Sequence, residues 1–309
     1  MSAREIFFAE GRRLRAPLRL ALFLLALVGC APLGRLVHFV LDPLTRAARL
    51  PAEAAFWWSA LAALVVAHLV MVKWIDRAGW DQVWLGRAAA RPSLLAWGTV
   101  LGALAIGVPS ALLLATGWLT TVTGAPGSSL QAALVVATIL VPAAMAEELL
   151  FRGYALRVLR DGIGWPAAIV ITSVVFALLH VNNPGAGPRP IALVTLAGIM
   201  LGAVVAAWRS LWAAWAAHFA WNFVLAALLH SAVSGGALPT PDYVVTDSGP
   251  DWATGGSWGP EGGVVAGLGM LGGLSFLYLR GRRGSAGSRN ASTLESVNAR
   301  PAGREEPLA

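Results

Sequence analysis

Long apolar runs separated by short polar stretches dominate the chain. Each run has about 20 residues, the length that a helix needs to cross the hydrocarbon of a bilayer. The pattern predicts eight membrane spans, which are roughly Leu18–Val40, Ala54–Val72, Leu94–Val122, Leu130–Leu150, Trp165–His180, Ile191–Trp208, Leu211–Leu229 and Val264–Leu279. The expected fold is therefore all-α, a polytopic membrane helix bundle of about eight transmembrane helices.

The composition supports a membrane protein over a soluble one. Hydrophobic residues make up 57% of the 309 residues and charged residues only 13%, whereas a soluble domain carries about 25% charged residues. The formal net charge of +7 indicates membrane orientation, because the arginines lie between the spans and not on one face. We therefore expect the lipid bilayer as a partner and no nucleic acid.

Basic residues gather on one side of the predicted spans. They fill the N-terminal stretch, the loops after the second and fourth spans and the C-terminal tail, while the outer loops contain only Arg46, Arg49 and Arg189. Lys and Arg are enriched in cytoplasmic loops. The distribution predicts that both termini are cytoplasmic, in a multi-pass protein of the cell membrane.

A single cysteine and two low-complexity segments add little chemistry. Cys30 rules out an intrachain disulfide, and it ends the sequence LVGC, which resembles a lipoprotein cleavage box. The apolar pattern continues to Val40, which favours a span that contains Gly-Cys over lipidation. The Gly-, Pro-, Ser- and Thr-rich composition of residues 231–263 predicts a flexible outer loop. The polar, Gly-, Ser- and Arg-rich composition of residues 281–309 predicts a disordered tail.

Chemically useful side chains within the spans fall on three stretches, EELLFR, FALLH and HFAWN. The candidates are Glu147, Glu148, Arg152, His180, His218 and Asn222. Ionisable residues inside a membrane are rare and usually functional. His38, His68 and His230 have no partner at a comparable spacing and are interpreted as packing or interfacial residues.

Helical geometry assigns different roles to the two adjacent glutamates. Glu148 and Arg152 are four residues apart, so they share a helix face and can form an ion pair. Glu147 points about 100° away from Glu148 and is the candidate for the chemistry. His218 and Asn222 also share one face, and Phe176 lies one turn before His180.

The depths of these side chains in the membrane also agree. Glu147 and His180 lie about 21 and 24 Å from the turn at Asp161–Gly164, at about 1.5 Å per residue. This estimate requires the helix of Glu147 to continue to about Arg160. We therefore expect Glu147, His180, His218 and Asn222 to face one cavity.

Such a cavity suits hydrolysis. Glu147 could accept a proton from water as a general base, and His180 could orient that water. His218 and Asn222 could donate hydrogen bonds to the oxyanion of an attacked peptide carbonyl. Alternatively, Glu147, His180 and His218 could hold a zinc ion that activates the water, so the sequence leaves the cofactor open between zinc and none.

The motifs Glu147-Glu148-x-x-x-Arg152, Phe176-x-x-x-His180 and His218-x-x-x-Asn222 resemble, in order and spacing, those of the CPBP intramembrane endopeptidases. This group includes type II CAAX prenyl proteases and the bacteriocin-processing and abortive-infection-like proteins. The resemblance covers roughly residues 129–230. It implies an eight-helix core and cleavage of a membrane-associated peptide or protein, of CAAX type or bacteriocin type.

The resemblance also assigns roles and divides the chain. It implies that Glu147 activates water and that His180, His218 and Asn222 complete the site. Residues 1–128 would then form an N-terminal region of three spans, residues 129–230 a catalytic core of four spans, and residues 231–309 an outer loop, a last span and a tail.

A membrane transporter or proton relay is the alternative, with the same Glu and His cluster passing protons. It predicts coupling to a gradient and no cleaved product. Transporters commonly contain internal repeats, and no repeat is evident in this sequence.

Overall fold

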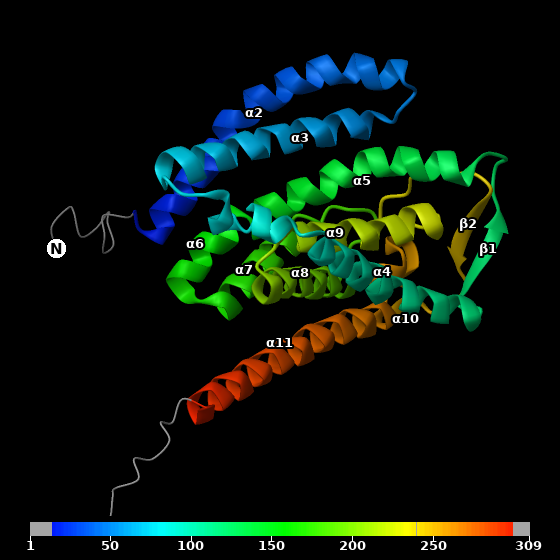
Figure 1. The fold of residues 1–309 in the computed structure, drawn as a ribbon. Coiled ribbons are helices and arrows are strands. Elements are labelled where there is room, and N and C mark those ends of the chain that lie inside the picture. Colours follow the sequence, from blue (N-terminus) through cyan, green and yellow to red (C-terminus); the bar gives the residue numbers. More distant parts are fainter. Residues whose placement is uncertain (1–13, 239, 299–309) are drawn as a thin grey trace, which may run out of the picture.

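The computed structural model describes residues 14–238 and 240–298, with side chains described up to residue 282. It is a helical bundle (Figure 1). The α-helices are α2 (Ala16–Ala47), α3 (Ala52–Leu69), α4 (Pro92–Ala115), α5 (Ser129–Arg152), α6 (Tyr154–Ile163), α7 (Trp165–Leu178), α8 (Pro188–Trp208), α9 (Leu211–Phe223), α10 (Asp251–Thr254) and α11 (Val264–Asn298). The prediction of an all-α membrane bundle is confirmed.

The number of long spans differs from the prediction. Among the described residues, seven helical segments are long and apolar enough to cross a membrane. The fifth predicted span, Trp165–His180, forms a helix of only 14 residues that ends at Leu178. This is shorter than the roughly 17–25 residues of a spanning helix, and it leaves His180 in the turn after α7.

A small sheet replaces part of one predicted span and part of the predicted loop. Strand β1 (Leu119–Thr123) pairs antiparallel with β2 (Tyr243–Asp247). Helix α4 therefore ends at Ala115, before the predicted Val122, and the β-branched sequence LTTVT forms the strand. Beyond β2, residues 248–263 form α10 and two short 3₁₀ turns, so this segment is structured where the composition predicted a flexible loop.

The sheet is tied to the start of α5 by Asp242. Its carboxylate accepts hydrogen bonds from the Ser129 hydroxyl, from the Ser129 N–H and from the Gly127 N–H. The hydroxyl of Ser129 and these backbone donors lower the pKa of Asp242 below its ordinary value. The segment that precedes β2 is thereby fixed to the first turn of α5.

Helices α2 and α3 lie together along one side of the bundle, and α11 lies along the other (Figure 1). Between them α5 packs against α9, and α9 packs closely on α4. Gly98 and Gly102 form this last contact, because a Cβ at either position would lie within 2.2 Å of a backbone carbonyl oxygen of α9. Small residues four apart let membrane helices approach in this way. The oxygen that faces Gly102 belongs to Ala217, the residue before His218.

The sequence predicted that the helix of Glu147 continues unbroken to about Arg160, and this prediction is wrong. The helix breaks at Gly153, directly after Arg152, and α6 begins at Tyr154. The buried His68 of α3 donates from Nδ1 to the Leu64 carbonyl, and its Nε2 accepts from the Tyr154 N–H at 3.2 Å. A Cβ at Gly153 would lie 2.5 Å from that Nε2. His68 therefore satisfies a free N–H of the new helix and fixes the end of α5.

An ion cluster joins α2 and α6 to Asp76, the residue directly after the helical segment Ala52–Ile75 that begins with α3. The Asp76 carboxylate accepts from Arg19 at 2.5 Å and from Arg157 at 2.8 Å. Arg19 also donates to the Tyr154 hydroxyl at 3.2 Å. The peripheral helix α2 is thus attached to the helix that follows the EELLFR stretch.

We predict that Gly102→Ala lowers the free energy of unfolding by about 1–3 kcal/mol, the usual cost of overpacking, because the added Cβ meets the Ala217 carbonyl. Gly107→Ala is the matched control in the same helix, since its Cβ would make only an ordinary contact at 3.9 Å. Thermal unfolding in detergent should separate the two variants. Equal melting temperatures would contradict the close α4–α9 contact.

Candidate functional site

Four of the predicted residues line one cavity. Glu147 of α5, His180 after α7, and His218 and Asn222 of α9 all face a space of about 360 Å³. A volume of this size falls within the range of about 300–1,000 Å³ found for small-molecule sites. The cavity is bounded mainly by apolar side chains, including Leu140, Met200 and Leu201.

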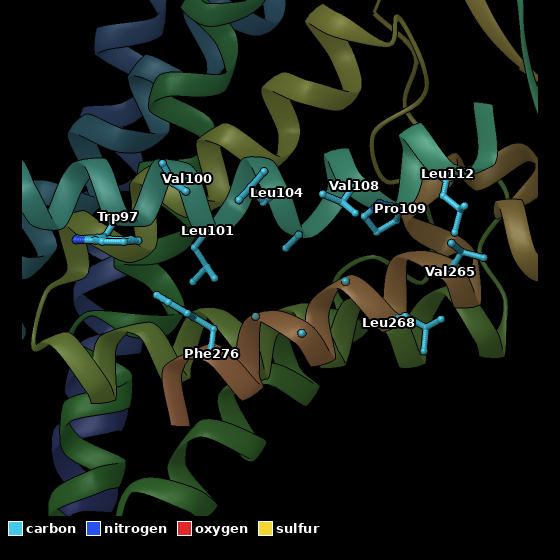
Figure 2. Close-up of a pocket in the computed structure, with 14 residues that line it drawn as sticks. Trp97, Val100, Leu101, Leu104, Val108, Pro109, Leu112, Val265, Leu268 and Phe276 are labelled. Atoms are coloured by element: carbon cyan, nitrogen blue, oxygen red, sulfur yellow. The ribbon is translucent and has the colours of Figure 1, made fainter. Parts of the chain in front are cut away.

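A larger groove of about 490 Å³ lies between α4 and α11. Figure 2 shows its lining, with Trp97, Leu104 and Val108 on one helix and Leu268 and Phe276 on the other. None of the described residues that line it is ionisable. The groove therefore offers no group for acid–base chemistry, and the cavity that contains Glu147 is the candidate site.

Glu148 and Arg152 form a buried ion pair next to Glu147 in the chain. Arg152 Nη1 lies 3.1 Å from Glu148 Oε1, and both side chains are 0% exposed. The predicted pairing of these two residues is confirmed. The Arg152 guanidinium also lies 4.5 Å from the centre of the Phe176 ring, a cation–π contact. A buried carboxylate needs such a partner, because an isolated charge is strongly unfavourable away from water.

His218 lies between the two adjacent glutamates. Its Nδ1 is 2.9 Å from Glu148 Oε1, and its Nε2 is 3.6 Å from Glu147 Oε2. Because a carboxylate beside an arginine accepts hydrogen bonds and does not donate them, the Nδ1 of His218 carries the hydrogen and donates it. The Nε2 is thereby aimed at Glu147. The sequence led us to expect instead that His218, together with Asn222, donates a hydrogen bond to the oxyanion.

The two glutamates differ in exposure as well as in direction. The side chain of Glu147 is 24% exposed, and that of Glu148 is 0% exposed. Glu147 lines the cavity, whereas Glu148 is buried and is not among the lining residues. The roughly 100° between successive helical residues places one carboxylate where water can reach it and the other where water cannot.

His180 is oriented by the main chain one turn earlier. Its Nδ1 lies 2.8 Å from the Phe176 carbonyl oxygen, which can only accept, so Nδ1 is the donor. The two rings pack edge to face with centroids 4.7 Å apart. The same Phe176 ring lies 6.1 Å from the His218 ring. The side chains of His180, His218 and Arg152 are therefore grouped around the Phe176 ring.

The predicted zinc ligands do not form a zinc site in this arrangement. Among the described residues, no three His, Cys, Asp or Glu side chains lie close enough to hold a metal ion. The Nδ1–H groups of His218 and His180 donate to Glu148 and to the Phe176 carbonyl, so only the Nε2 atom of each ring is left for a ligand. Because the set Glu147, His180 and His218 does not fit a metal as placed, no chemical step below uses one.

Several side chains that line the cavity are not among the predicted site residues. They are Glu53, Trp57, Asn183, Trp221, Ser234 and Glu261. Ser234 and Glu261 belong to the segment that composition predicted to be a flexible loop. The signal that could have indicated Glu261 is an acidic residue in a glycine-rich stretch directly before the last apolar run.

Residues 129–224 match the family model described as Rce1-like, type II CAAX prenyl endopeptidase Rce1-like. No curated protein and no solved structure matches the chain. The matched region begins at the first residue of α5 and includes the stretches that contain Glu147, His180 and His218. As the resemblance to the CPBP endopeptidases predicted, residues 129–224 form an Rce1-like domain of the type II CAAX prenyl endopeptidase family.

Proposed function

We propose that the protein is an intramembrane endopeptidase of CAAX type, in which Glu147 activates the attacking water. The observation that carries this proposal is the position of His218, whose two ring nitrogens face Glu148 and Glu147. One carboxylate is buried and paired, and the other faces a cavity. This arrangement fits an acid–base group held in a fixed orientation by a buried support.

In the proposed reaction, Glu147 accepts a proton from water and the water oxygen attacks the carbonyl carbon of a peptide bond. The carbon–nitrogen bond then breaks, and the amine leaves with the proton that Glu147 has gained. His218 shares that proton through Nε2, which lies 3.6 Å from Glu147 Oε2. The hydrogen bond to Glu148 fixes the tautomer that this sharing requires.

Asn222 and His180 are the remaining polar groups of the mechanism. Asn222 lies one turn after His218 and lines the cavity, so its amide can donate to the developing oxyanion. His180, with Nδ1 donated to the Phe176 carbonyl, can accept a hydrogen bond from the attacking water through Nε2 in the neutral ring. The apolar walls suit a membrane-associated peptide or protein as substrate, and bacteriocin-type processing is a second candidate reaction.

The proton-relay alternative is less well supported by the same geometry. A relay needs a path for the proton on both sides. Beyond His218 the next groups are Glu148 and Arg152, which are 0% exposed and paired with each other. A proton delivered there would meet a buried cation and could go no further. The arrangement therefore favours a structural role for Glu148 and Arg152 over a path for proton transport.

We predict that Glu147→Gln lowers cleavage by at least about 100-fold, the typical minimum contribution of a general base, while the protein still inserts and folds. The measurement is a comparison of the peptides in cells that express the wild type or the variant, followed by rates with purified protein on a peptide so identified. His180→Ala should also abolish cleavage. A purified Glu147→Gln protein that cleaves at the wild-type rate would show that Glu147 is not the base.

We expect Glu148→Gln and Arg152→Ala to lower both activity and stability, because each leaves a buried charge unpaired. Breaking a buried ion pair costs about 3–5 kcal/mol. Thermal unfolding of the purified variants measures the loss, and Glu147→Gln is the matched control, since it removes a neighbouring, partly exposed charge that is not paired with Arg152. If both variants melt at the wild-type temperature, the pair is not a structural support.

We also predict that purified protein retains its cleavage activity after treatment with a chelator, because the His and Glu donors do not converge as a three-ligand set. Metal analysis of the same sample shows whether zinc is bound. Loss of activity on chelation, restored by added zinc, would support the zinc alternative.

A further inference from the structure

We propose that Glu261 is a positioning residue that clamps one wall of the cavity to the helix that carries His218. The wall segment is residues 233–238, of which Val233, Ser234, Gly236, Ala237 and Leu238 line the cavity. Glu261 itself lines the same cavity. It lies beyond residue 224, outside the matched domain. The effect on cleavage rests on the proposed function, whereas the clamp itself can be tested without it.

The Glu261 carboxylate accepts three hydrogen bonds from two different elements. Its Oε2 accepts from the indole Nε1 of Trp221 at 2.6 Å. Its Oε1 accepts from the N–H of Ser234 at 2.6 Å and from the Ser234 hydroxyl at 2.8 Å. Glu261 is only 7% exposed and Trp221 only 5% exposed. One side chain therefore connects α9 to the wall segment.

The donors around Glu261 match a carboxylate, which offers only acceptors. The Trp221 indole and the Ser234 backbone N–H can only donate, and each meets one of the two carboxylate oxygens as acceptor. A neutral amide at this position would turn its own N–H groups toward one of these donors in either orientation. Hydrogen bonds to an ionised acceptor are about twice as strong as neutral ones, and they offset the cost of burying the charge.

The wall segment has a second attachment, on the side of His180. Asn183 donates through Nδ2 to the Ser234 carbonyl at 2.9 Å. Asn183 lies in the turn that contains His180, and its N–H donates to the His180 carbonyl at 3.1 Å. In addition, the Gly235 N–H donates to the Trp258 carbonyl at 2.9 Å. The wall segment is therefore held between the two elements that carry the candidate histidines.

Trp221, which donates to Glu261, lies next to the candidate catalytic residues of α9. It is three residues after His218 and one before Asn222, and all three line the cavity. Glu261 does not contact Glu147 or either histidine by a hydrogen bond or ion pair within the described residues. It therefore acts through the wall segment and Trp221, and its loss should affect substrate binding more than the chemical step.

The test uses the full-length protein and the variant Glu261→Gln. Hydrogen–deuterium exchange of residues 231–238 should become at least about tenfold faster, since the variant loses about one net hydrogen bond to an ionised acceptor. Exchange in α5 should not change. Asp251→Asn is the control, because Asp251 is an exposed carboxylate in the same part of the chain and makes the same change in charge. We expect this control to behave as the wild type.

The kinetic part uses a peptide identified by comparing the wild type with Glu147→Gln. Glu261→Gln should raise KM about tenfold and change kcat by less than about threefold, as expected when ground-state binding is lost. Adding Trp221→Phe to Glu261→Gln should restore part of KM, because the amide N–H then no longer faces the indole donor. This recovery would not occur if the substitution only destabilised the fold.

Two results would overturn the proposal that Glu261 is a positioning residue. One is unchanged exchange in residues 231–238 of Glu261→Gln. The other is an active variant with wild-type KM, even if its melting temperature falls. A wild type that cleaves no peptide would contradict the proposed endopeptidase activity, and the exchange measurement would still decide whether Glu261 holds the wall segment.

Discussion

The buried ion pair between Glu148 and Arg152 is the interaction on which the candidate site depends. Both side chains are inaccessible to water, at 0% exposed, and they lie 3.1 Å apart. Arg152 allows Glu148 to remain a carboxylate away from solvent, and Glu148 in turn accepts the Nδ1 hydrogen of His218. The Glu148 charge would be unfavourable alone in a membrane. Paired with Arg152, it accepts a hydrogen bond that orients the His218 ring toward Glu147.

The helices around this pair are placed by contacts outside the motifs. His68 of α3 accepts from the Tyr154 N–H and so fixes the break directly after Arg152. Gly102 of α4 allows the Ala217 carbonyl, next to His218, to approach the α4 backbone. At the wall of the cavity, Glu261 and Asn183 hold Ser234. Each contact sets the position of an element that carries a candidate catalytic group.

Much of this arrangement follows from spacing in the sequence. The separation of four residues predicts the Glu148–Arg152 pair, and the rotation of about 100° per residue separates Glu147 from it. The helical rise along the spans predicts that Glu147, His180, His218 and Asn222 face one cavity, and all four line the cavity of about 360 Å³. Spacing could not predict the bond from His218 to Glu148, because two helices distant in sequence make it. Nor could composition predict that the glycine-rich stretch before α11 folds and supplies Glu261, since its order comes from tertiary hydrogen bonds.

The position of the hydrogen on the His218 ring shows whether Glu148 orients this imidazole. Nitrogen NMR of the protein in lipid, with labelled histidine, reports which ring nitrogen bears the hydrogen. We expect a hydrogen on Nδ1 of His218, bonded to Glu148, and a change in that signal in Glu148→Gln. A neutral His218 with its hydrogen on Nε2 only, unaffected by Glu148→Gln, would contradict a mechanism in which Glu148 orients His218 toward Glu147.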